Sequence, residues 1–335
     1  TAFENGWVKP VKPPREREQS VGIIGGGPGG LAAAEQLRKK GYQVHVYDRY
    51  DRMGGLMIYG IPNFKLEKDV VERRSKLLAD GGIHMHHNVE IGSTVTMDEL
   101  RQKHDAILIA TGVYKARDFK APGIGLPGIV PALDYLTASN KKGLGDEVQD
   151  FDNGTLNATG KRVVVIGGGD TAMDCVRTAI RQGAESVSCV YRRDRANMPG
   201  SQREVANAEE EGVDFKWLSA PEAFLGDDSV TGVRCQQIHL GVPDATGRQS
   251  PQVIDGSSFT IECDMAIKAL GFDPEDLPKL FGTDGLDVSQ WGTVRIDFRT
   301  MMTSLDGVFA AGDIVRGASL VVWAVRDGRD VAERM

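Results

Sequence analysis

Two segments of the sequence carry glycines at the spacing of a dinucleotide phosphate site. In the first segment, Gly25, Gly27 and Gly30 follow a short apolar strand on the G-x-G-x-x-G pattern. The first glycine permits a tight turn, the second lets the backbone approach a pyrophosphate, and the third lets a helix pack close to the strand. An alanine-rich helix is expected over residues 31–40, and the N–H groups at its start favour an anion. The segment therefore predicts a bound flavin or nicotinamide dinucleotide.

An acidic residue follows where the ribose of such a dinucleotide would lie. Asp48 ends the next expected strand, residues 42–47. It stands about 20 residues after the glycines, where an acid accepts hydrogen bonds from a pair of ribose hydroxyls. Glycine turns that bind nothing also join strands to helices. The order of strand, turn, helix, strand and acid nevertheless favours the nucleotide site.

The same pattern returns in the middle of the chain with one change of charge. Residues 162–174 again form an apolar strand, a glycine turn around Gly169 and the start of a helix. Where the first copy has Asp48, the second has Arg192 and Arg193. A carboxylate would repel the 2′-phosphate of NADP, whereas a guanidinium binds it through charge-assisted hydrogen bonds. The second copy therefore predicts an NADPH site, with arginines on a solvated strand end as the alternative.

The other elements indicate how two domains carry these sites. Residues 106–112 suit a strand buried on both faces of a parallel sheet, and residues 307–314 form a similar strand that leads into Asp313. A loop-rich stretch at residues 115–160 marks a domain crossing, and short alternating strands are expected later at residues 213–218, 230–240 and 259–267. We therefore expect an α/β protein with two Rossmann-like dinucleotide-binding domains, the second inserted into the first. The expected bounds are a linker over residues 1–20, a first domain over residues 21–125 and 290–335, and a second domain over residues 126–289.

Length, composition and charge limit the class of protein. At 335 residues and 36.3 kDa the chain exceeds the size of a usual single core, so two domains are expected. A net charge of −7 and a pI near 5.5 argue against nucleic-acid or anionic-membrane partners. No apolar run approaches the roughly 18 residues that cross a bilayer, and no signal-peptide pattern opens the chain. We expect a soluble, cytoplasmic protein.

The cysteines and histidines indicate neither a redox disulfide nor a metal site. No C-x-x-C pair occurs, which argues against a flavin disulfide reductase and against an iron–sulfur cluster ligated within this chain. His84, His86 and His87 lie close together in the sequence, but no carboxylate or cysteine supports them as metal ligands. We expect reduced structural thiols at the four cysteines, Cys175, Cys189, Cys235 and Cys263.

Three motifs give the sequence a resemblance to a known family. They are Gly-Gly-Leu-Met-Ile-Tyr-Gly-Ile-Pro-Asn-Phe-Lys at 54–65, Gly-Gly-Gly-Asp-Thr-Ala-Met-Asp at 167–174 and Tyr-Arg-Arg at 191–193. The order of parts along nearly the whole chain is similar to that of glutathione-reductase-like flavoproteins with two dinucleotide-binding domains. More narrowly, the chain resembles the small (beta) subunit of NADPH-dependent glutamate synthase. Dihydropyrimidine dehydrogenase and NADPH:ferredoxin oxidoreductase subunits contain a similar module.

The resemblance implies an activity, cofactors and a partner. Hydride would pass from NADPH to FAD, and electrons would then pass through iron–sulfur clusters to a large (alpha) subunit that makes L-glutamate from L-glutamine and 2-oxoglutarate. We expect the cluster cysteines in an N-terminal domain outside this sequence. Hydride transfer needs no side-chain acid or base, so no catalytic residue is expected. The alternative is a dihydropyrimidine-dehydrogenase-like or NADPH:ferredoxin-type electron-transfer flavoprotein.

The resemblance also implies site residues, position by position. The residues implied to hold FAD are Gly25, Gly27, Gly29, Gly30, Asp48, Leu56, Lys65, Ile91, Gly312 and Asp313. Those implied to hold NADPH are Gly169, Asp170, Thr171, Arg192, Arg193 and Gly271. The chain departs from the usual pattern at Gly29, where alanine is common, and at Asp48, where glutamate is common. Either acid can hold a ribose.

Two further functions stay open at the level of the sequence. A flavin monooxygenase would keep both nucleotide sites, and oxygen consumption with substrate turnover would distinguish it. A redox sensor that binds NADPH and signals through a partner would keep them too. Steady-state turnover with an artificial acceptor would separate such a sensor from a reductase.

Overall fold

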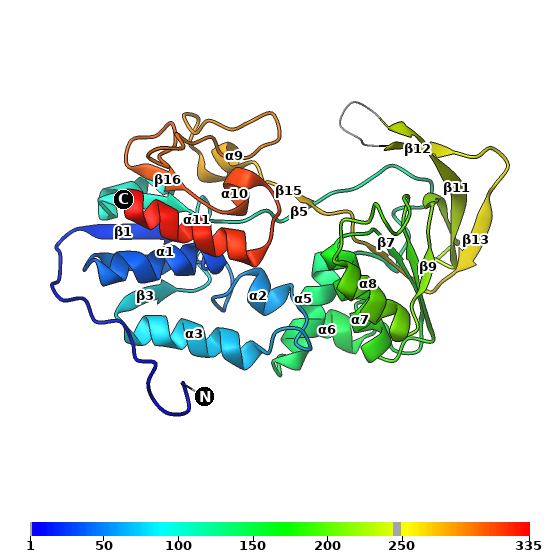
Figure 1. Cartoon of the computed structure of the whole chain (residues 1–335), viewed down its shortest axis with the longest axis horizontal. Helices are drawn as coiled ribbons and strands as arrows, with labels where there is room; N and C mark the ends of the chain where they lie inside the picture. Colours follow the sequence, from blue (N-terminus) through cyan, green and yellow to red (C-terminus); the bar gives the residue numbers. More distant parts are fainter. Residues whose placement is uncertain (1, 244–248) are drawn as a thin grey trace. The chain divides into compact units, whose positions relative to one another are not determined.

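The structure is a computed structural model that describes residues 2–243 and 249–335, in two compact units (Figure 1). The first unit consists of residues up to 58, residues 66–115 and residues 272–335, and the second of residues 59–65 and 116–271. The second unit is thus inserted in the chain of the first, as the predicted fold class requires.

The first unit is built on a five-stranded parallel sheet in the order β16-β4-β1-β2-β3. Alternate residues of β4 enter two different apolar cores, Leu108 on one face and Ile107 and Ile109 on the other. This confirms that the predicted strand is buried on both faces. The strands are β1 (Ser20–Ile24), β2 (Gln43–Tyr47), β3 (Ile83–His86), β4 (Ala106–Ile109) and β16 (Val308–Ala310).

Helices cover both faces of this sheet. On one face lie α1 (Pro28–Lys39), α3 (Lys68–Asp80) and α11 (Val321–Arg334). Helices α1 and α11 approach so closely that a Cβ on Gly328 would lie 2.1 Å from the carbonyl oxygen of Gly29. The opposite core includes residues of α4 (Met97–Lys103), α9 (Leu277–Phe281) and α10 (Asp313–Arg316). The short α2 (Leu56–Tyr59) follows the loop after β2.

The second unit repeats the arrangement on a parallel sheet in the order β6-β14-β7-β8-β9. Its strands are β6 (Ile129–Pro131), β7 (Arg162–Ile166), β8 (Ser186–Val190), β9 (Asp214–Lys216) and β14 (Met265–Lys268). Its helices are α5 (Ala132–Gly143), α6 (Gln149–Asp152), α7 (Asp170–Arg181) and α8 (Gln202–Glu210). An antiparallel sheet is formed by β10 (Ser219–Leu225), β11 (Gly232–Pro243), β12 (Gln249–Val253) and β13 (Phe259–Glu262). Residues of β10, β11 and β13 contribute to the core on the other face of the parallel sheet. Two parallel α/β sheets confirm the predicted fold class.

The compact units and the predicted domains have different bounds. Residues 116–125 lie in the second unit, and residues 272–289 lie in the first. The chain leaves the first unit at β5 (Lys115–Ala116) and returns to it at β15 (Phe272–Asp273). These two short strands pair with each other. Helix α9 follows the return and adds its side chains to the core of the first unit. The pairing of β5 with β15 joins residues far apart in the sequence, so no local pattern of residues indicates it.

One predicted strand was wrong. The sequence favours a single strand over residues 259–267, but the structure divides it at Cys263 and Asp264. Residues before the break pair antiparallel with β11, and residues after it pair parallel with β6 and β7. The chain changes sheets here, so one continuous segment of the sequence forms two strands.

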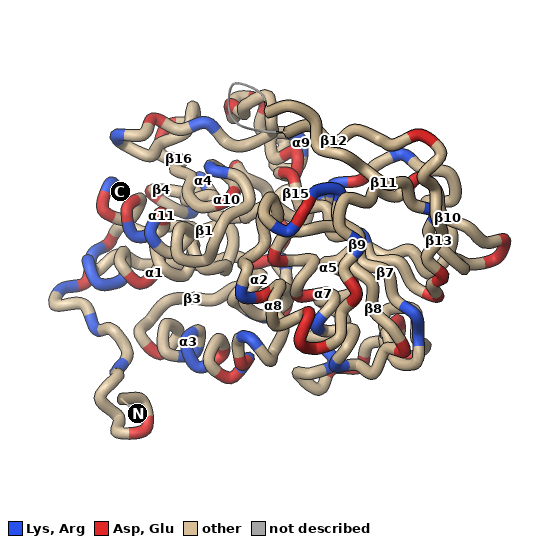
Figure 2. The backbone as a smooth tube through the Cα atoms, turned by 45° about the vertical axis from the view of Figure 1, so that its right-hand side comes forward, with Lys and Arg blue, Asp and Glu red and all other residues tan. Residues whose placement is uncertain are grey.

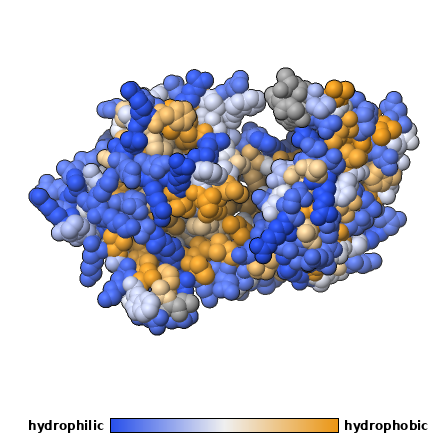
Figure 3. Space-filling view, viewed as in Figure 1, coloured by the Kyte–Doolittle hydropathy of each residue, from blue (hydrophilic) through white to orange (hydrophobic). Residues whose placement is uncertain are grey.

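Hydrophilic residues cover most of the face of the molecule that Figure 3 shows, and Figure 2 shows acidic and basic residues interspersed along the chain. Within residues 2–243 and 249–335, none of the helices has the length and apolar character that crossing a membrane requires.

Histidines cluster with Tyr47 on one face of the first sheet, at the β2–β3 edge. The rings of His45 and His86 are joined by an Nδ1···Nε2 hydrogen bond of 3.0 Å, and His84 stacks on His45 with 4.5 Å between ring centroids. His104, after α4, is 2.9 Å from the Tyr47 hydroxyl through its Nε2. The bond from His45 to His86 needs one ring nitrogen without a proton, so at least one of these imidazoles is neutral.

The surroundings of the cluster oppose its protonation. Burial lowers the pKa of His45 to about 4, and the neighbouring histidines add to this effect. Burial, with the ammonium of Lys103, likewise lowers the pKa of His104 to about 4. Each group is therefore harder to protonate in the folded chain than in the unfolded chain, where its pKa is about 6.5.

We expect the thermal midpoint of the first unit to fall as the pH is lowered from about 6.5 towards 4. Over this range the unfolded chain binds protons at His45 and His104 that the folded chain does not bind, so unfolding becomes more favourable as the pH falls. Glutamine at both positions should make the midpoint less dependent on pH, as measured by calorimetry. His239→Gln on β11 is the matched control and should keep the wild-type dependence. An unchanged dependence in the double variant would contradict this account.

Candidate functional site

Both glycine turns lie where the strand order of a parallel sheet reverses. From β1 the chain continues to β2 and β3 on one side, whereas β4 pairs with β1 on the other side. From β7 the chain continues to β8 and β9, whereas β14 pairs with β7 on the other side. Ligands of open α/β sheets bind outside the carboxyl ends of the strands at such a point. Each turn is therefore a candidate nucleotide site on topological grounds.

The first turn has the geometry of a phosphate cradle. Gly25 has φ of +107°, and a Cβ there would lie 2.4 Å from the carbonyl oxygen of Ala110. A Cβ on Gly30 would lie 2.0 Å from the carbonyl oxygen of Gly25, so only glycine lets α1 pack this close to β1. A Cβ on Gly27 would meet no described atom within 4 Å. The backbone at Gly27 is therefore open to a ligand at the N-terminus of α1.

Asp48 is held against this turn. Its Oδ2 accepts a hydrogen bond of 2.6 Å from the backbone N–H of Gly26, and its Oδ1 accepts one of 2.9 Å from that of Tyr50. Burial raises the pKa of Asp48, while these hydrogen bonds act in the opposite direction. Each oxygen accepts one bond from the chain, and a carboxylate oxygen can accept two. The side chain thus has capacity to bind a ligand hydroxyl.

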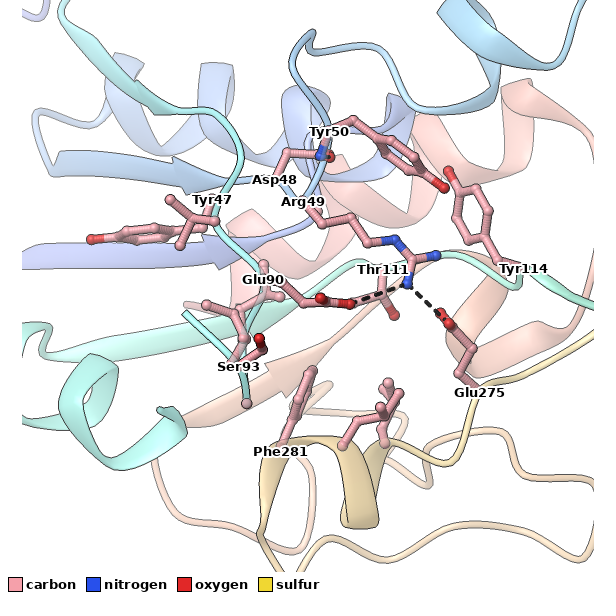
Figure 4. Close-up of a pocket in the computed structure, with 17 residues that line it drawn as sticks. Tyr47, Asp48, Arg49, Tyr50, Glu90, Ser93, Thr111, Tyr114, Glu275 and Phe281 are labelled. Atoms are coloured by element: carbon pink, nitrogen blue, oxygen red, sulfur yellow. Dashed lines mark hydrogen bonds and ion pairs between the residues drawn. The ribbon is translucent and has the colours of Figure 1, made fainter. Parts of the chain in front are cut away.

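A cavity of about 190 Å³ opens beside Asp48 in the first unit (Figure 4). Of the predicted FAD residues, Gly25, Asp48 and Ile91 line it. Its other lining residues are Ile24, Tyr47, Arg49, Tyr50, Val89, Glu90, Gly92, Ser93, Thr111, Tyr114, Glu275, Leu277, Leu280 and Phe281. The cavity therefore combines one carboxylate from the predicted site with apolar and aromatic walls.

Arg49 is fixed at the wall of this cavity. Its Nη1 donates to Glu275 Oε1 at 2.9 Å and lies 3.9 Å from Glu90 Oε1. Its guanidinium also lies over two tyrosine rings, 5.3 Å from the centroid of Tyr50 and 4.9 Å from that of Tyr114. Figure 4 shows these side chains gathered around the guanidinium. A planar cation among aromatic rings suits a flat aromatic ligand.

The C-terminal segment returns to the same turn. Gly312 has φ of +80° and precedes Asp313, the first residue of α10. Asp313 Oδ1 accepts a hydrogen bond of 2.7 Å from the Ser319 hydroxyl, just before α11 begins. Ala324 of α11 lies close to both Gly29 and Gly312. A Cβ on Gly29 would lie 3.3 Å from the carbonyl oxygen of Ala324, and a Cβ on Gly312 would lie 4.0 Å from the Cβ of Ala324. The structure thus brings Gly312 together with the start of α1.

The glycine-rich loop after β2 covers the first turn. The N–H of Gly54 donates to the carbonyl oxygen of Gly26 at 2.8 Å, and a Cβ on Gly55 would lie 3.0 Å from the Cα of Gly27. Leu56 begins α2 directly after this loop. Lys65 belongs to the second unit, where its ammonium is 2.7 Å from Asp174 Oδ1.

The second turn repeats the first in the other unit. Gly167 has φ of +147°, and a Cβ there would lie 2.2 Å from the carbonyl oxygen of Ala269. A Cβ on Gly169 would meet no described atom within 4 Å, as at Gly27. Asp170 and Thr171 are the first residues of α7, and Asp170 Oδ1 accepts a hydrogen bond of 2.9 Å from the backbone N–H of Ser201, just before α8. The second turn is therefore also open at its central glycine.

The remaining predicted residues lie at the carboxyl ends of neighbouring strands. Ile166, the last residue of β7, pairs with the last residue of β8 and with the last residue of β14. Arg192 follows the end of β8 by two residues, and Gly271 follows the end of β14 by three. Arg192 is exposed, and Arg193 is half-buried. Among the described residues, Nε and Nη2 of Arg193 are buried without a hydrogen-bond partner. Such donors favour an anionic ligand at this edge of the sheet.

Sequence reasoning missed several residues of the cavity. Arg49 directly follows Asp48, and Thr111 ends the buried strand, so both had a local signal. Tyr114 and Glu275 had none, because they reach the cavity from the segments that leave and re-enter the first unit. Only the pairing of distant strands places them beside Asp48.

Comparison with known proteins identifies relatives over nearly the whole chain. The family model for pyridine nucleotide-disulphide oxidoreductases matches residues 19–328. The chain is 71% identical to the glutamate synthase (NADPH) small chain of Azospirillum brasilense, over 99% of this chain and 69% of that protein. It is 45% identical to the glutamate synthase (NADPH) small chain of Halomonas elongata, over 99% of this chain and 71% of that protein.

A solved structure has a similar fold. FprA from Mycobacterium tuberculosis, in complex with NADPH, aligns with a TM-score of 0.77 over 95% of this chain and 83% of its own. Sequence identity is 19%, so this likeness concerns the fold alone. The family match and the identities to the small chains carry the assignment. The chain therefore belongs to the pyridine nucleotide-disulphide oxidoreductase family and, among its members, to the group of the NADPH-dependent glutamate synthase small chains.

Proposed function

We propose that this chain is a flavoprotein module that transfers hydride from NADPH to FAD. The observation that carries the proposal is the pair of glycine turns, each with an open central glycine at the N-terminus of a helix. Asp48 lies beside the first turn, whereas Arg192 and Arg193 lie beside the second. The acid suits a ribose diol, and the arginines suit a ribose that carries a 2′-phosphate.

The first unit fits FAD. Gly27 leaves room for a pyrophosphate, and Asp48 keeps acceptor capacity for a ribose hydroxyl pair. Thr111 Oγ1 lines the cavity and is buried without a hydrogen-bond partner among the described residues, so a polar ligand atom would satisfy it. The other residues proposed to hold FAD are Gly25, Gly29, Gly30, Leu56, Ile91, Gly312 and Asp313. Lys65, implied by the family resemblance, is treated separately below.

The second unit fits NADPH. Gly169, Asp170 and Thr171 would place the pyrophosphate at the start of α7, where helix N–H groups favour an anion. The two unpaired donors of Arg193 would bind 2′-phosphate oxygens together with Arg192. Gly271 lies at the same edge of the sheet, where its lack of a side chain keeps space for the nucleotide.

The chemistry is that of the two cofactors. When bound, FAD accepts a hydride from NADPH and releases electrons one at a time. The chain itself binds and orients them, and we assign no catalytic acid or base. The bond from Ser319 to Asp313 fixes the chain just before α11, whose N-terminal N–H groups favour negative charge nearby.

We further propose that electrons leave through iron–sulfur clusters to a glutamate synthase large (alpha) subunit, for L-glutamate synthesis from L-glutamine and 2-oxoglutarate in the cytoplasm. The names of the relatives and the three motifs support this route. All four cysteines are buried, and the described residues contain no group of three or more His, Cys, Asp or Glu side chains that could hold a metal ion. The cluster ligands would therefore come from outside the described residues. No nucleic acid or membrane partner is proposed.

Valine at either open glycine should weaken the binding of one cofactor and leave the other bound. Gly27→Val should weaken FAD binding by about two orders of magnitude or more, because the side chain fills the approach to several N–H groups. Gly169→Val should weaken NADPH binding to a similar extent and leave FAD bound. Both glycines have extended backbones and open space around the Cβ position, so both variants should fold. The measurements are flavin per chain after reconstitution and the Kd of NADP⁺.

Each glycine variant is the control for the other, since the substitution and the local geometry match. Flavin absorbance at wild-type level in Gly27→Val would refute the FAD assignment of the first turn. Loss of both cofactors in either variant would indicate misfolding, which near-UV circular dichroism would detect.

Coenzyme choice should depend on Arg192 and Arg193. A lost charge-assisted hydrogen bond is worth on the order of 1.5 to 3 kcal/mol, so alanine at both positions should lower kcat/KM for NADPH by about two orders of magnitude. NADH lacks the 2′-phosphate, and its kcat/KM should change little. The measurement is flavin reduction by each coenzyme in both proteins. Equal losses for NADPH and NADH would mean that the arginines serve folding or the shared part of the nucleotide.

A further inference from the structure

Seven residues, from the last residue of α2 towards the start of α3, pack within the second unit. This segment, residues 59–65, is called the arm below. At its start, the carbonyl oxygen of Tyr59 accepts a hydrogen bond of 3.0 Å from the buried amide of Asn140. Near its end, the Phe64 ring lies 4.9 Å from the guanidinium of Arg177 and 3.9 Å from that of Arg181. The arm is thus attached to α5 at one end and to α7 at the other.

Lys65 completes the arm with two ion pairs. Its ammonium is 2.7 Å from Asp174 Oδ1 on α7 and 3.2 Å from Glu204 Oε2 on α8. The side chain of Asp174 is 11% exposed and that of Lys65 23%, so solvent screens this pair only partly. Burial opposes the charge of Lys65, but attraction to the two carboxylates raises its pKa. The ammonium therefore stays charged beside Asp174.

Asp174 carries a buried charge close to the second glycine turn. It lies one helical turn after Asp170, which begins α7 next to Gly169, and the two carboxylates repel each other. Burial raises the pKa of Asp174 to about 6, against the lowering effect of Lys65. Glu204 also faces it, and this second carboxylate is bound by Arg177 at 2.6 Å.

Arg177 and Arg181 are both engaged with Glu211. Arg177 Nη2 lies 2.7 Å from Glu211 Oε1, and Arg181 Nη2 lies 2.9 Å from the same oxygen. These guanidinium groups are therefore committed to other acids, while Lys65 lies within direct contact of Asp174. In Figure 2, basic and acidic segments lie close together around α7 and α8.

We propose that Lys65 is a positioning residue of the NADPH site: its ammonium compensates the buried carboxylate of Asp174 and so holds α7, which presents the second glycine turn. This rests on the proposed function, in which that turn binds NADPH. Without Lys65, an uncompensated carboxylate lies one turn from the nucleotide phosphates and repels them. The family resemblance implies instead that Lys65 holds FAD, so the two roles give opposite results on substitution.

The test compares Lys65→Met, Asp174→Asn, the double variant and Lys65→Arg in the whole chain. We expect Lys65→Met to keep its FAD and to bind NADP⁺ about tenfold more weakly at pH 8. The loss relative to wild type should be smaller at pH 6, because Asp174 then takes up a proton and its repulsion disappears. The double variant should return to within about threefold of wild type, and Lys65→Arg should keep wild-type affinity. The measurements are flavin per chain and the Kd of NADP⁺ by calorimetry.

Lys76→Met is the matched control, since it removes the same charge from an exposed pair with Asp80 on α3. It should leave both FAD content and NADP⁺ affinity unchanged. If Lys65→Met fails to fold, Asp174→Asn and the double variant decide, because neither leaves a buried carboxylate unpaired at this position. Under the proposal these two variants bind NADP⁺ about equally.

Two results would overturn the proposal. Loss of FAD from Lys65→Met that the Asp174→Asn change does not restore would assign Lys65 to the flavin. Unchanged NADP⁺ affinity in Lys65→Met at both pH values would show that Asp174 needs no compensation. If wild type bound NAD⁺ as tightly as NADP⁺, the assigned 2′-phosphate site would fail instead. The Lys65 effect would then still be measured with NAD⁺, which shares the pyrophosphate.

Discussion

The tight packing of each glycine turn against neighbouring backbone is the constraint on which both candidate sites depend. At the first turn, α1 comes so near β1 that a Cβ on Gly30 would lie 2.0 Å from the oxygen of Gly25. At the second turn, Gly167 leaves no room for a side chain against Ala269, which follows the neighbouring strand β14. This packing fixes the backbone from which each helix begins, so that its unpaired N–H groups face the space where Gly27 and Gly169 admit a phosphate. A side chain at the tight positions would displace the turn and lose that alignment.

Two turns of the same backbone geometry acquire different ligands through the side chains at the end of the next strand. Asp48 is locked by two backbone N–H groups, so its position relative to the turn is set by the chain itself. Arg193 instead retains buried donors without partners among the described residues. Leaving such donors unsatisfied is unfavourable by about 1 to 3 kcal/mol each, and an anionic ligand would remove this penalty. Selectivity then depends on charge, while the shared turn supplies the pyrophosphate contacts.

The sequence alone could predict the parts of the fold that depend on local pattern. Both strand–turn–helix units, the acid after the first and the strand buried on both faces are encoded within short windows, and the structure contains each of them. The split of residues 259–267, the position of Glu275 beside Arg49 and the arm in the second unit depend on pairing between distant segments. Histidine clustering shows the same limit: His84 and His86 are neighbours in sequence, but only the sheet brings His45 to them.

The charged face shared by α7 and α8 shows why a nucleotide site tolerates buried ions. Glu211 lies between two guanidinium groups, which hold its pKa near 2, and Glu204 lies between Arg177 and Lys65. Apolar side chains could stabilise such a helix pair equally well, because burying ions carries a desolvation penalty. Ion pairs differ in being directional: each fixes the position of one helix relative to the next. A helix whose first residues must meet a phosphate gains from this fixed position, since a small displacement of its N–H groups weakens every contact at once.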